Sequence, residues 1–177
     1  SSSFRYGFVH ETILEMEILT GDGKVVTATK TNKHKDLFFG FPNTYGTLGY
    51  VLKLKVKLVK TKKYVKITRH RFTDMGKFFK KCADLTKKHL HDMHVGFIEA
   101  FCFGPNEFYI AVCEFVDKAP YTSDYTFMKI YYKSMSKRKI DYLTTFDYIW
   151  RFDPDWIWCS KLFGMENKLL RFFFGKF

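Results

Sequence analysis

The stretch from Tyr50 to Val59 constrains the fold most tightly, because its side chains alternate in type over most of its length. Apolar residues occupy every second position and lysines lie between them: Leu52, Leu54, Val56 and Leu58 alternate with Lys53, Lys55 and Lys57. A period of two is that of a β-strand, whose successive side chains point to opposite faces. We therefore expect a strand with one buried face and one cationic, solvated face.

Two glycines, Gly46 and Gly49, stand just before this strand, at the end of the loop FPNTYGTLG. Glycine at the start of a strand indicates either a strained backbone or the close approach of another group. The pattern alone leaves both a simple turn and a ligand cradle open.

The preceding residues predict a β-hairpin and one short helix. Thr12–Leu19 alternates well enough for a half-buried strand, and Val25–Thr29 is its expected partner across the turn Gly21-Asp22-Gly23. Lys35–Phe39 is expected to form one helical turn.

A polar break at Thr61-Lys62-Lys63 predicts a domain boundary near residue 63, giving units 1–63 and 64–177. Beyond it, the pattern predicts a strand, a helix capped by Thr73 or Asp74, and two strands joined by a turn at residues 104–107. The ranges are Tyr64–Phe72, Asp74–His89, Val95–Phe103 and Phe108–Val116. This order indicates an α+β unit that resembles half of a ferredoxin-like layer.

The composition argues for a folded, strongly basic protein. Of the 177 residues 46% are hydrophobic and 20% aromatic, which is enough for a core and argues against disorder. The net charge of +12 indicates attraction to an anion, whether a nucleotide phosphate, a nucleic acid or an acidic membrane surface.

The four cysteines lie far apart, without a CxxC pair, so a zinc ribbon or a thioredoxin motif is excluded: Cys82, Cys102, Cys113 and Cys159. Each lies in an apolar run, which predicts buried, reduced thiols. The chain shows neither a signal peptide nor an apolar run long enough to predict a transmembrane segment.

Three further patterns are weak candidates for chemistry. His89, His91 and His94 lack metal-ligand spacing and predict a solvated helix end, so no metal site is expected. Asp153 and Asp155 flank a proline and predict a turn rather than an acid–base pair. The basic stretch 53–71 could follow a nucleic acid backbone, but lysines also protect an edge strand from aggregation, so nucleic acid is the minor alternative.

Two long stretches resemble one family. SSSFRYGFVHETILEMEILTGDGKVVTAT and DLFFGFPNTYGTLGYVLKLKVKL are similar to the FAD-binding core of the vanillyl-alcohol-oxidase (VAO) type of oxidoreductase, and most of all to the Δ24-sterol reductases and their bacterial relatives. The likeness is strong over residues 1–66 and patchier beyond.

The resemblance implies an α+β fold: the C-terminal half of a VAO/PCMH-type FAD-binding domain (1–63) followed by a partial α+β cap domain (64–177). It also implies FAD contacts from two segments, the serine-rich start and the glycine loop: Ser1, Ser2, Ser3, Tyr6, Gly7, Gly46, Thr47, Gly49 and Tyr50. Bare main chain at the glycines would present N–H groups to the cofactor.

The implied function is hydride transfer through the flavin, with NADPH as electron donor and the side-chain alkene of a sterol-like lipid as acceptor. Aromatic residues of the cap would suit such a substrate or a membrane surface: Trp150, Phe152, Trp156, Trp158 and Phe163. The location implied is the cytoplasm or the cytosolic face of a membrane. No catalytic acid can be named from this chain.

Two alternatives stay open at this point. One is a flavin-dependent oxidase or dehydrogenase for another alcohol or lipid; the other is a non-catalytic basic domain that binds anionic membranes or nucleic acid. The implied fold also lacks its pyrophosphate-binding half, so we expect this chain to be a fragment that binds FAD weakly by itself.

Overall fold

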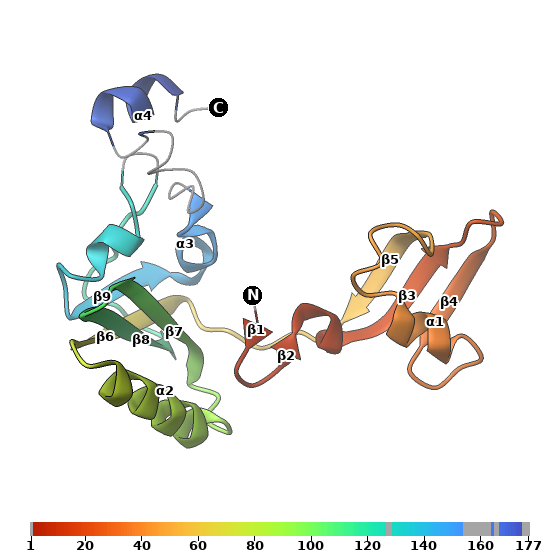
Figure 1. Cartoon of the computed structure of the whole chain (residues 1–177), viewed down its shortest axis with the longest axis horizontal. Coiled ribbons are helices and arrows are strands. Elements are labelled where there is room, and N and C mark those ends of the chain that lie inside the picture. Colours follow the sequence, from red (N-terminus) through yellow and green to blue (C-terminus); the bar gives the residue numbers. More distant parts are fainter. Residues whose placement is uncertain (1, 127–128, 154–163, 165–166, 175–177) are drawn as a thin grey trace. The chain divides into compact units, whose positions relative to one another are not determined.

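The computed structural model describes residues 2–126, 129–153, 164 and 167–174. The chain divides into two compact units, Ser1–Lys60 and Thr61–Phe177 (Figure 1). The division lies near the break predicted from Thr61-Lys62-Lys63. Whether the units are parts of an FAD-binding domain and a cap domain stays a prediction.

The first unit is built on a three-stranded antiparallel sheet with the order β4-β3-β5. Its strands are β3 (Ile13–Leu19), β4 (Val25–Thr29) and β5 (Tyr50–Val56). Before them come β1 (Ser2–Ser3), β2 (Gly7–Phe8) and the 3-10 helix η1 (Val9–Thr12), and between β4 and β5 comes the helix α1 (Lys35–Gly40). The predicted hairpin and helical turn are therefore confirmed.

The core of the first unit lies between α1 and the β3–β4 side of the sheet. Its buried members are Ile13, Met16, Ile18, Ala28 and Phe38. Figure 1 shows α1 beside β4, the strand that it follows in the chain. The core therefore forms on one side of the sheet and toward one edge.

The prediction of a half-buried strand at Tyr50–Val59 is wrong. The strand is present, but Leu52, Leu54 and Val56 keep 56%, 48% and 40% of their surface exposed. Leu54 lies opposite Met16 in the ladder, on the face that carries the core, yet among the described residues α1 covers the β4 side instead. The alternation predicted the strand correctly. Whether one face is buried depends on which element packs over it, and this cannot be read from the alternation.

The second unit contains a four-stranded antiparallel sheet with the order β7-β8-β6-β9. Its strands are β6 (Tyr64–Phe72), β7 (Val95–Gly104), β8 (Glu107–Val116) and β9 (Ile140–Thr144). Its helices are α2 (Met75–His89), the 3-10 turn η2 (Tyr132–Ser134), α3 (Thr145–Trp150) and α4 (Lys168–Phe174). The strand order is that of a ferredoxin-like layer, with the 3-10 turn η2 among the described residues where that motif has its second helix. The α+β class is confirmed.

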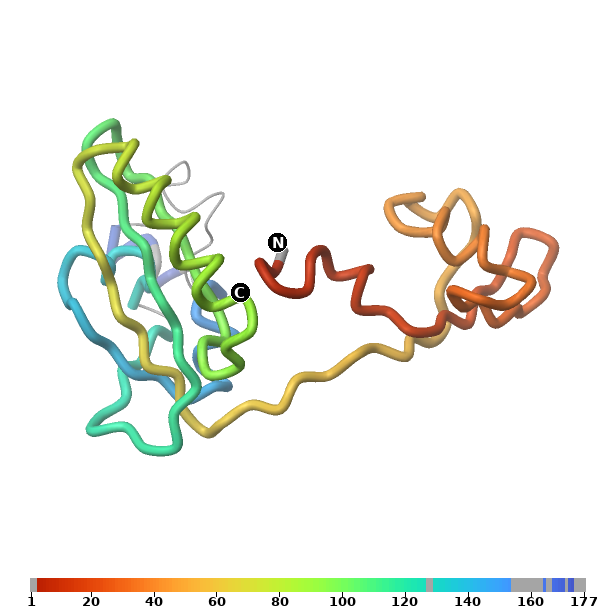
Figure 2. Tube along the Cα trace, turned by 90° about the horizontal axis from the view of Figure 1, so that it is seen from below, coloured from red at the N-terminus to blue at the C-terminus, as the bar shows by residue number. Residues whose placement is uncertain are grey.

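Both faces of this sheet are covered by apolar cores. On one face α2 packs through Phe78 and Leu85 onto Phe108 and Ile110 of β8, and Figure 2 shows this helix, in yellow-green, lying along the strands. The other face carries a larger cluster centred on Tyr131, Leu143 and Tyr148.

The helix α2 begins where the sequence predicts. Asp74 is its N-cap, and its side chain accepts a hydrogen bond of 2.7 Å from the Lys77 N–H. Such a bond satisfies one of the unpaired donors of the first turn.

Candidate functional site

The predicted cofactor contacts at the chain start form a tight turn of their own. Ser1 and the side chain of Ser2 lie outside the described residues. The Ser3 hydroxyl oxygen accepts hydrogen bonds from the main-chain N–H groups of Arg5 and Tyr6, both at 3.2 Å. The Tyr6 ring lies 5.5 Å from the Lys57 ammonium group. Ser3 therefore has a structural task in this turn.

Gly7 is also required by its neighbours. Its φ angle is +70°, and a Cβ atom there would lie 2.0 Å from a carboxylate oxygen of Glu11. That carboxylate accepts a hydrogen bond of 2.6 Å from the Phe8 N–H. The close approach at Gly7 comes from within the protein.

Gly49 stands at the start of β5 because another part of the backbone approaches it closely. Its φ angle is +125°, and a Cβ atom there would lie 2.1 Å from the main-chain oxygen of Leu19. The neighbouring strand β3 therefore excludes any side chain at this position. The group that approaches Gly49 closely is the protein's own backbone.

The rest of this loop, residues 43–48, is strained and exposed. Asn43 and Tyr45 adopt φ angles of 63° and 51°, and Gly46 follows at 85°. Left-handed conformations cost energy in residues other than glycine, and such strain gathers at ligand sites. Tyr45 is 96% exposed and Tyr50, which ends the loop, 69%. Thr47 is held in the turn by a bond of 2.8 Å from its hydroxyl to the Thr44 oxygen.

Several main-chain donors of this loop have no acceptor in the described part of the chain. They are the N–H groups of Asn43, Tyr45, Gly46 and Leu48. A Cβ atom at Gly46 would meet nothing closer than the Tyr50 ring, at 3.7 Å. The loop therefore offers bare backbone donors and an exposed aromatic ring side by side.

The two predicted cofactor segments lie at opposite ends of β3. The serine turn, residues 2–7, precedes Ile13, which pairs with Val56. The glycine loop, residues 43–49, ends at Tyr50, which pairs with Leu19. Leu19 lies six residue steps along the strand from Ile13, which is about 20 Å at the usual rise per residue. A ligand touching both segments must be extended along the sheet.

The second unit contains a buried ion pair that the sequence analysis missed. Arg69 Nη2 lies 3.0 Å from Asp141 Oδ2, and the two side chains are 1% and 0% exposed. Arg69 also donates bonds of 2.9 Å to the hydroxyl and the main-chain oxygen of Ser134. The hydroxyls of Ser123 and Tyr125 donate to the same carboxylate. These bonds replace most of the lost hydration of both charges; the Arg69 Nε atom is buried and has no hydrogen-bond partner among the described residues.

A second ionic cluster lies across the Tyr131 ring. Glu99 accepts hydrogen bonds from the hydroxyls of Tyr131 and Tyr148 and pairs with Arg151. The guanidinium carbons of Arg69 and Arg151 lie 5.8 Å and 5.3 Å from the Tyr131 ring centroid. One aromatic ring therefore lies within cation–π distance of two guanidinium groups, of Arg69, which is buried, and Arg151, which is partly buried.

Burial and the Glu99 charge change the acidity of this core. Both raise the pKa of Tyr131 well above its ordinary value. Burial, the neighbouring Cys113 and Glu99 do the same for the pKa of Tyr148. Cys113 is a core residue, fully buried in this cluster, and its burial raises the pKa of its thiol.

Two features of the sequence point to these clusters. Arg69 follows Val65 and Ile67 on the inward face of β6, and Glu99 interrupts the apolar run of β7. A charged residue at an inward position predicts a buried partner. The partners could not be assigned, because Asp141 lies 72 residues from Arg69 along the chain.

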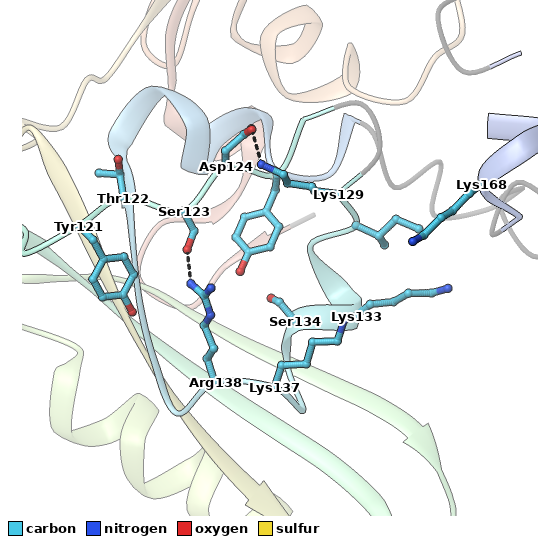
Figure 3. A pocket seen from close by; sticks show the side chains of 12 residues that line it. Tyr121, Thr122, Ser123, Asp124, Lys129, Lys133, Ser134, Lys137, Arg138 and Lys168 are labelled. Carbon is cyan, nitrogen blue, oxygen red and sulfur yellow. Dashed lines mark hydrogen bonds and ion pairs between the residues drawn. The ribbon is translucent and has the colours of Figure 1, made fainter. Parts of the chain in front are cut away.

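A pocket of about 610 Å³ opens above the buried ion pair. Figure 3 shows its lysine side chains and the two interactions that cross it, from Lys129 to Asp124 and from Arg138 to Ser123. Basic residues dominate the lining: Lys129, Lys133, Lys137, Arg138 and Lys168. The arrangement favours an anion but, with Asp124 as the one carboxylate among the described lining residues, offers little for acid–base catalysis.

The remaining sequence candidates occupy ordinary positions. His89 bonds to Asp92 at 3.0 Å, and no His, Cys, Asp and Glu cluster among the described residues could hold a metal ion. The prediction that every cysteine is buried is wrong, because Cys102 near the end of β7 is exposed and Cys82 is partly so. Alternation along an edge strand turns Cys102 outward. Cys159, Asp155, Trp156, Trp158 and Phe163 lie outside the described residues.

Comparison with known proteins gives a consistent set of relatives. No family model matches the chain. A Δ(24)-sterol reductase of Pisum sativum is 43% identical over 67 residues, which are 38% of this chain and 12% of the relative. A Δ(24)-sterol reductase homologue of Caenorhabditis elegans is 30% identical over 133 residues, which are 70% of this chain and 25% of the relative.

The resemblance to the Δ(24)-sterol reductases is confirmed. Cytokinin dehydrogenase 3 of Arabidopsis thaliana is also similar, with 33% identity over 76 residues that make up 43% of this chain and 14% of that protein. Reductases and dehydrogenases are oxidoreductases, so these names support the oxidoreductase class predicted from the sequence. The matched part of this chain spans a quarter or less of the length of these three relatives.

Proposed function

We propose that this chain is part of an FAD-dependent oxidoreductase of the VAO type that reduces the side-chain alkene of a sterol-like lipid, with NADPH as electron donor. The similarity to Δ(24)-sterol reductases over up to 70% of the chain carries the proposal. In this proposal the first unit belongs to the FAD-binding domain and the second to the cap domain.

The glycine loop fits a role in holding the cofactor. Its free donors at Tyr45, Gly46 and Leu48 suit phosphate or flavin oxygens, and the exposed Tyr50 ring suits an aromatic or ribose face. The serine turn, with Ser3, Tyr6 and Gly7, would contact the other end of an extended dinucleotide. When bound, the flavin supplies the hydride chemistry, and these residues bind and orient it.

The second unit would cover the lipid substrate. On α3 the side chains of Phe146, Ile149 and Trp150 form one face at helical spacing and are 70%, 59% and 52% exposed. Such a face suits either an apolar polycyclic ligand or a membrane surface, and the basic composition favours an anionic one. Phe152 is instead partly buried against the core. No helix among the described residues has the length and apolar character needed to span a bilayer.

The similarity to cytokinin dehydrogenase supports a second candidate, an FAD-dependent dehydrogenase or oxidase of another substrate. An activity assay separates the two candidates. The full oxidoreductase of which we propose this chain to be a part, here called the longer gene product, should consume NADPH with a Δ24-sterol under the first proposal. Under the second it should oxidise its substrate. Absence of a flavin absorbance band in that protein would overturn both.

A pair of variants in the longer gene product tests the loop. Tyr50→Ala should weaken FAD binding at least about tenfold, or about 1.4 kcal/mol. Phe39→Ala is the matched control, because this ring is also exposed in the first unit (63%) but lies on α1. Equal FAD affinity in the two variants would contradict the role of the loop.

The 177-residue chain by itself should bind FAD more weakly than about micromolar, because an incomplete cradle leaves most of the ordering cost uncompensated. Titration of the purified chain with FAD, followed by flavin fluorescence, checks this expectation. A micromolar or tighter complex would contradict it.

A further inference from the structure

The second unit contains another basic pocket, which takes no part in the proposed flavin binding. It has a volume of about 670 Å³ and lies where β6 runs past the end of β9, since Thr68 is the last β6 residue that pairs with β9 and the strand continues to Phe72. The α2 helix lines one side of it and the chain between η2 and β9 the other. Six Lys or Arg residues line it: Arg69, Arg71, Lys81, Lys137, Arg138 and Lys139.

Few negative charges compensate these cations. None of the described residues lining the pocket is Asp or Glu. Asp141 lies beneath two of the arginines, 3.0 Å from Arg69 and 3.5 Å from Arg138, and Glu107 accepts the hydroxyl bond of Tyr109. Lys81, Lys137 and Lys139 form no ion pair within the described part of the chain, so their charges face the pocket uncompensated.

His70 also lines the pocket, and the positive charges around it affect its imidazole pKa. Burial lowers its imidazole pKa, and the charges of Lys81 on α2 and Lys139 after η2 lower it further. Two elements therefore bring like charges to one point, which costs energy unless an anion joins them.

We propose that this pocket binds a phosphate monoester or diphosphate group. Lysine and arginine donors from three directions suit the oxygens of a phosphate, and the volume matches a small-molecule site. The Ser136 hydroxyl adds a neutral donor in the lining. All of its lining residues belong to the second unit, and the proposal does not rest on flavin binding.

The test uses pyrophosphate as the probe and calorimetry with the 177-residue chain as the measurement. Lys81→Gln combined with Lys139→Gln should weaken pyrophosphate binding at least about tenfold. The control is Lys87→Gln combined with Lys88→Gln, which removes the same charge from exposed positions at the end of α2. Circular dichroism confirms that both variants are folded.

Equal weakening in the two double variants, or no binding to the unaltered chain, would overturn the proposal. A second readout is the His70 imidazole pKa, measured by NMR, which should rise when pyrophosphate binds because the anion offsets the lysine charges. A His70 pKa that does not respond would also overturn it.

Vesicles of phosphatidylcholine with and without phosphatidic acid identify the source of the phosphate. Binding to the phosphatidic acid vesicles that pyrophosphate displaces, and that the Lys81/Lys139 variant loses, assigns the pocket to a lipid headgroup. Pyrophosphate binding without vesicle binding assigns it to a soluble phosphate compound. Vesicle binding that is equal in all variants, together with no pyrophosphate binding, would overturn the proposal.

Discussion

The two units of the chain use similar antiparallel sheets but differ in how those sheets are covered. The sheet of the first unit has one small core beneath α1 and leaves Leu52, Leu54 and Val56 of β5 exposed. The sheet of the second unit has cores on both faces and two ionic clusters in one of them. Burial therefore depends on which elements follow a strand, and not on its alternation alone. We expect the second unit to be the more stable.

The largest effect should come from the buried ion pair. Asp141→Asn leaves Arg69 buried without its counter-charge and should destabilise the second unit by about 3–5 kcal/mol. Chemical denaturation followed by tryptophan fluorescence measures this unit alone, because all three tryptophans lie beyond residue 149. Asp117→Asn is the matched control, since its carboxylate pairs with Lys62 while 75% exposed. Equal midpoints for both variants would contradict the difference in coverage.

A pair of leucines compares the two sheets directly. Leu143→Ala removes a fully buried side chain from β9 and should cost about 2–5 kcal/mol. Leu54→Ala on β5, which is 48% exposed, should cost less than about 1 kcal/mol. The stability loss of Leu143→Ala is measured by denaturation followed by fluorescence. That of Leu54→Ala is measured by amide hydrogen exchange of β3. A cost at Leu54 as large as that at Leu143 would show that β5 is covered in solution.

A glycine pair tests the backbone of the first unit. Gly49→Ala forces a Cβ atom against the Leu19 oxygen at a φ angle of +125° and should destabilise the unit by about 2–4 kcal/mol. Gly21→Ala, where a Cβ atom meets nothing within 4 Å, is the control and should change little. Hydrogen exchange of the β3–β4 amides provides the measurement. Tolerance of alanine at position 49 would mean that the loop relaxes away from β3.

The smallest effect should be the acid response of the first hairpin. Hydrogen bonds from Lys24 and Thr20 lower the pKa of Asp22 below its ordinary value of 3.8. The resulting stability is present above pH 3.8 and is lost as the pH falls through the lower, folded-state pKa. Because the pair is exposed, Asp22→Asn should scarcely change stability at neutral pH. A marked loss at pH 7, seen by hydrogen exchange, would contradict this.

Local patterns predicted the elements well, and tertiary context explains what they missed. The strand Tyr64–Phe72 has the predicted bounds, since alternation and a capped helix start define both its ends. The exposed face of β5 could not be predicted, because it depends on where α1 packs. The partner of Arg69 could not be predicted either, because it comes from the last strand of the sheet.

The cofactor contacts remain a prediction, and the structure has refined their meaning. Gly7 and Gly49 have sufficient reasons within the protein, namely Glu11 and the Leu19 oxygen. Among the described residues, no atom approaches Gly46 as closely, and the Tyr50 ring is largely exposed, so these two positions keep the better case for contact with a ligand. The sequence pattern alone could not separate these two kinds of glycine, because both give the same letter.

The lysines of β5 have a consequence for handling the isolated chain. This strand forms one edge of its sheet, and the unpaired backbone N–H and C=O groups of such an edge can pair with the edge of a second copy. Lys53, Lys55 and Lys57 set like charges against each other in such a pair and so oppose fibril-like growth. At about 1 M salt the Debye length is only about 3 Å, so this repulsion between chains is screened. Low-salt buffers should therefore keep the isolated chain from associating.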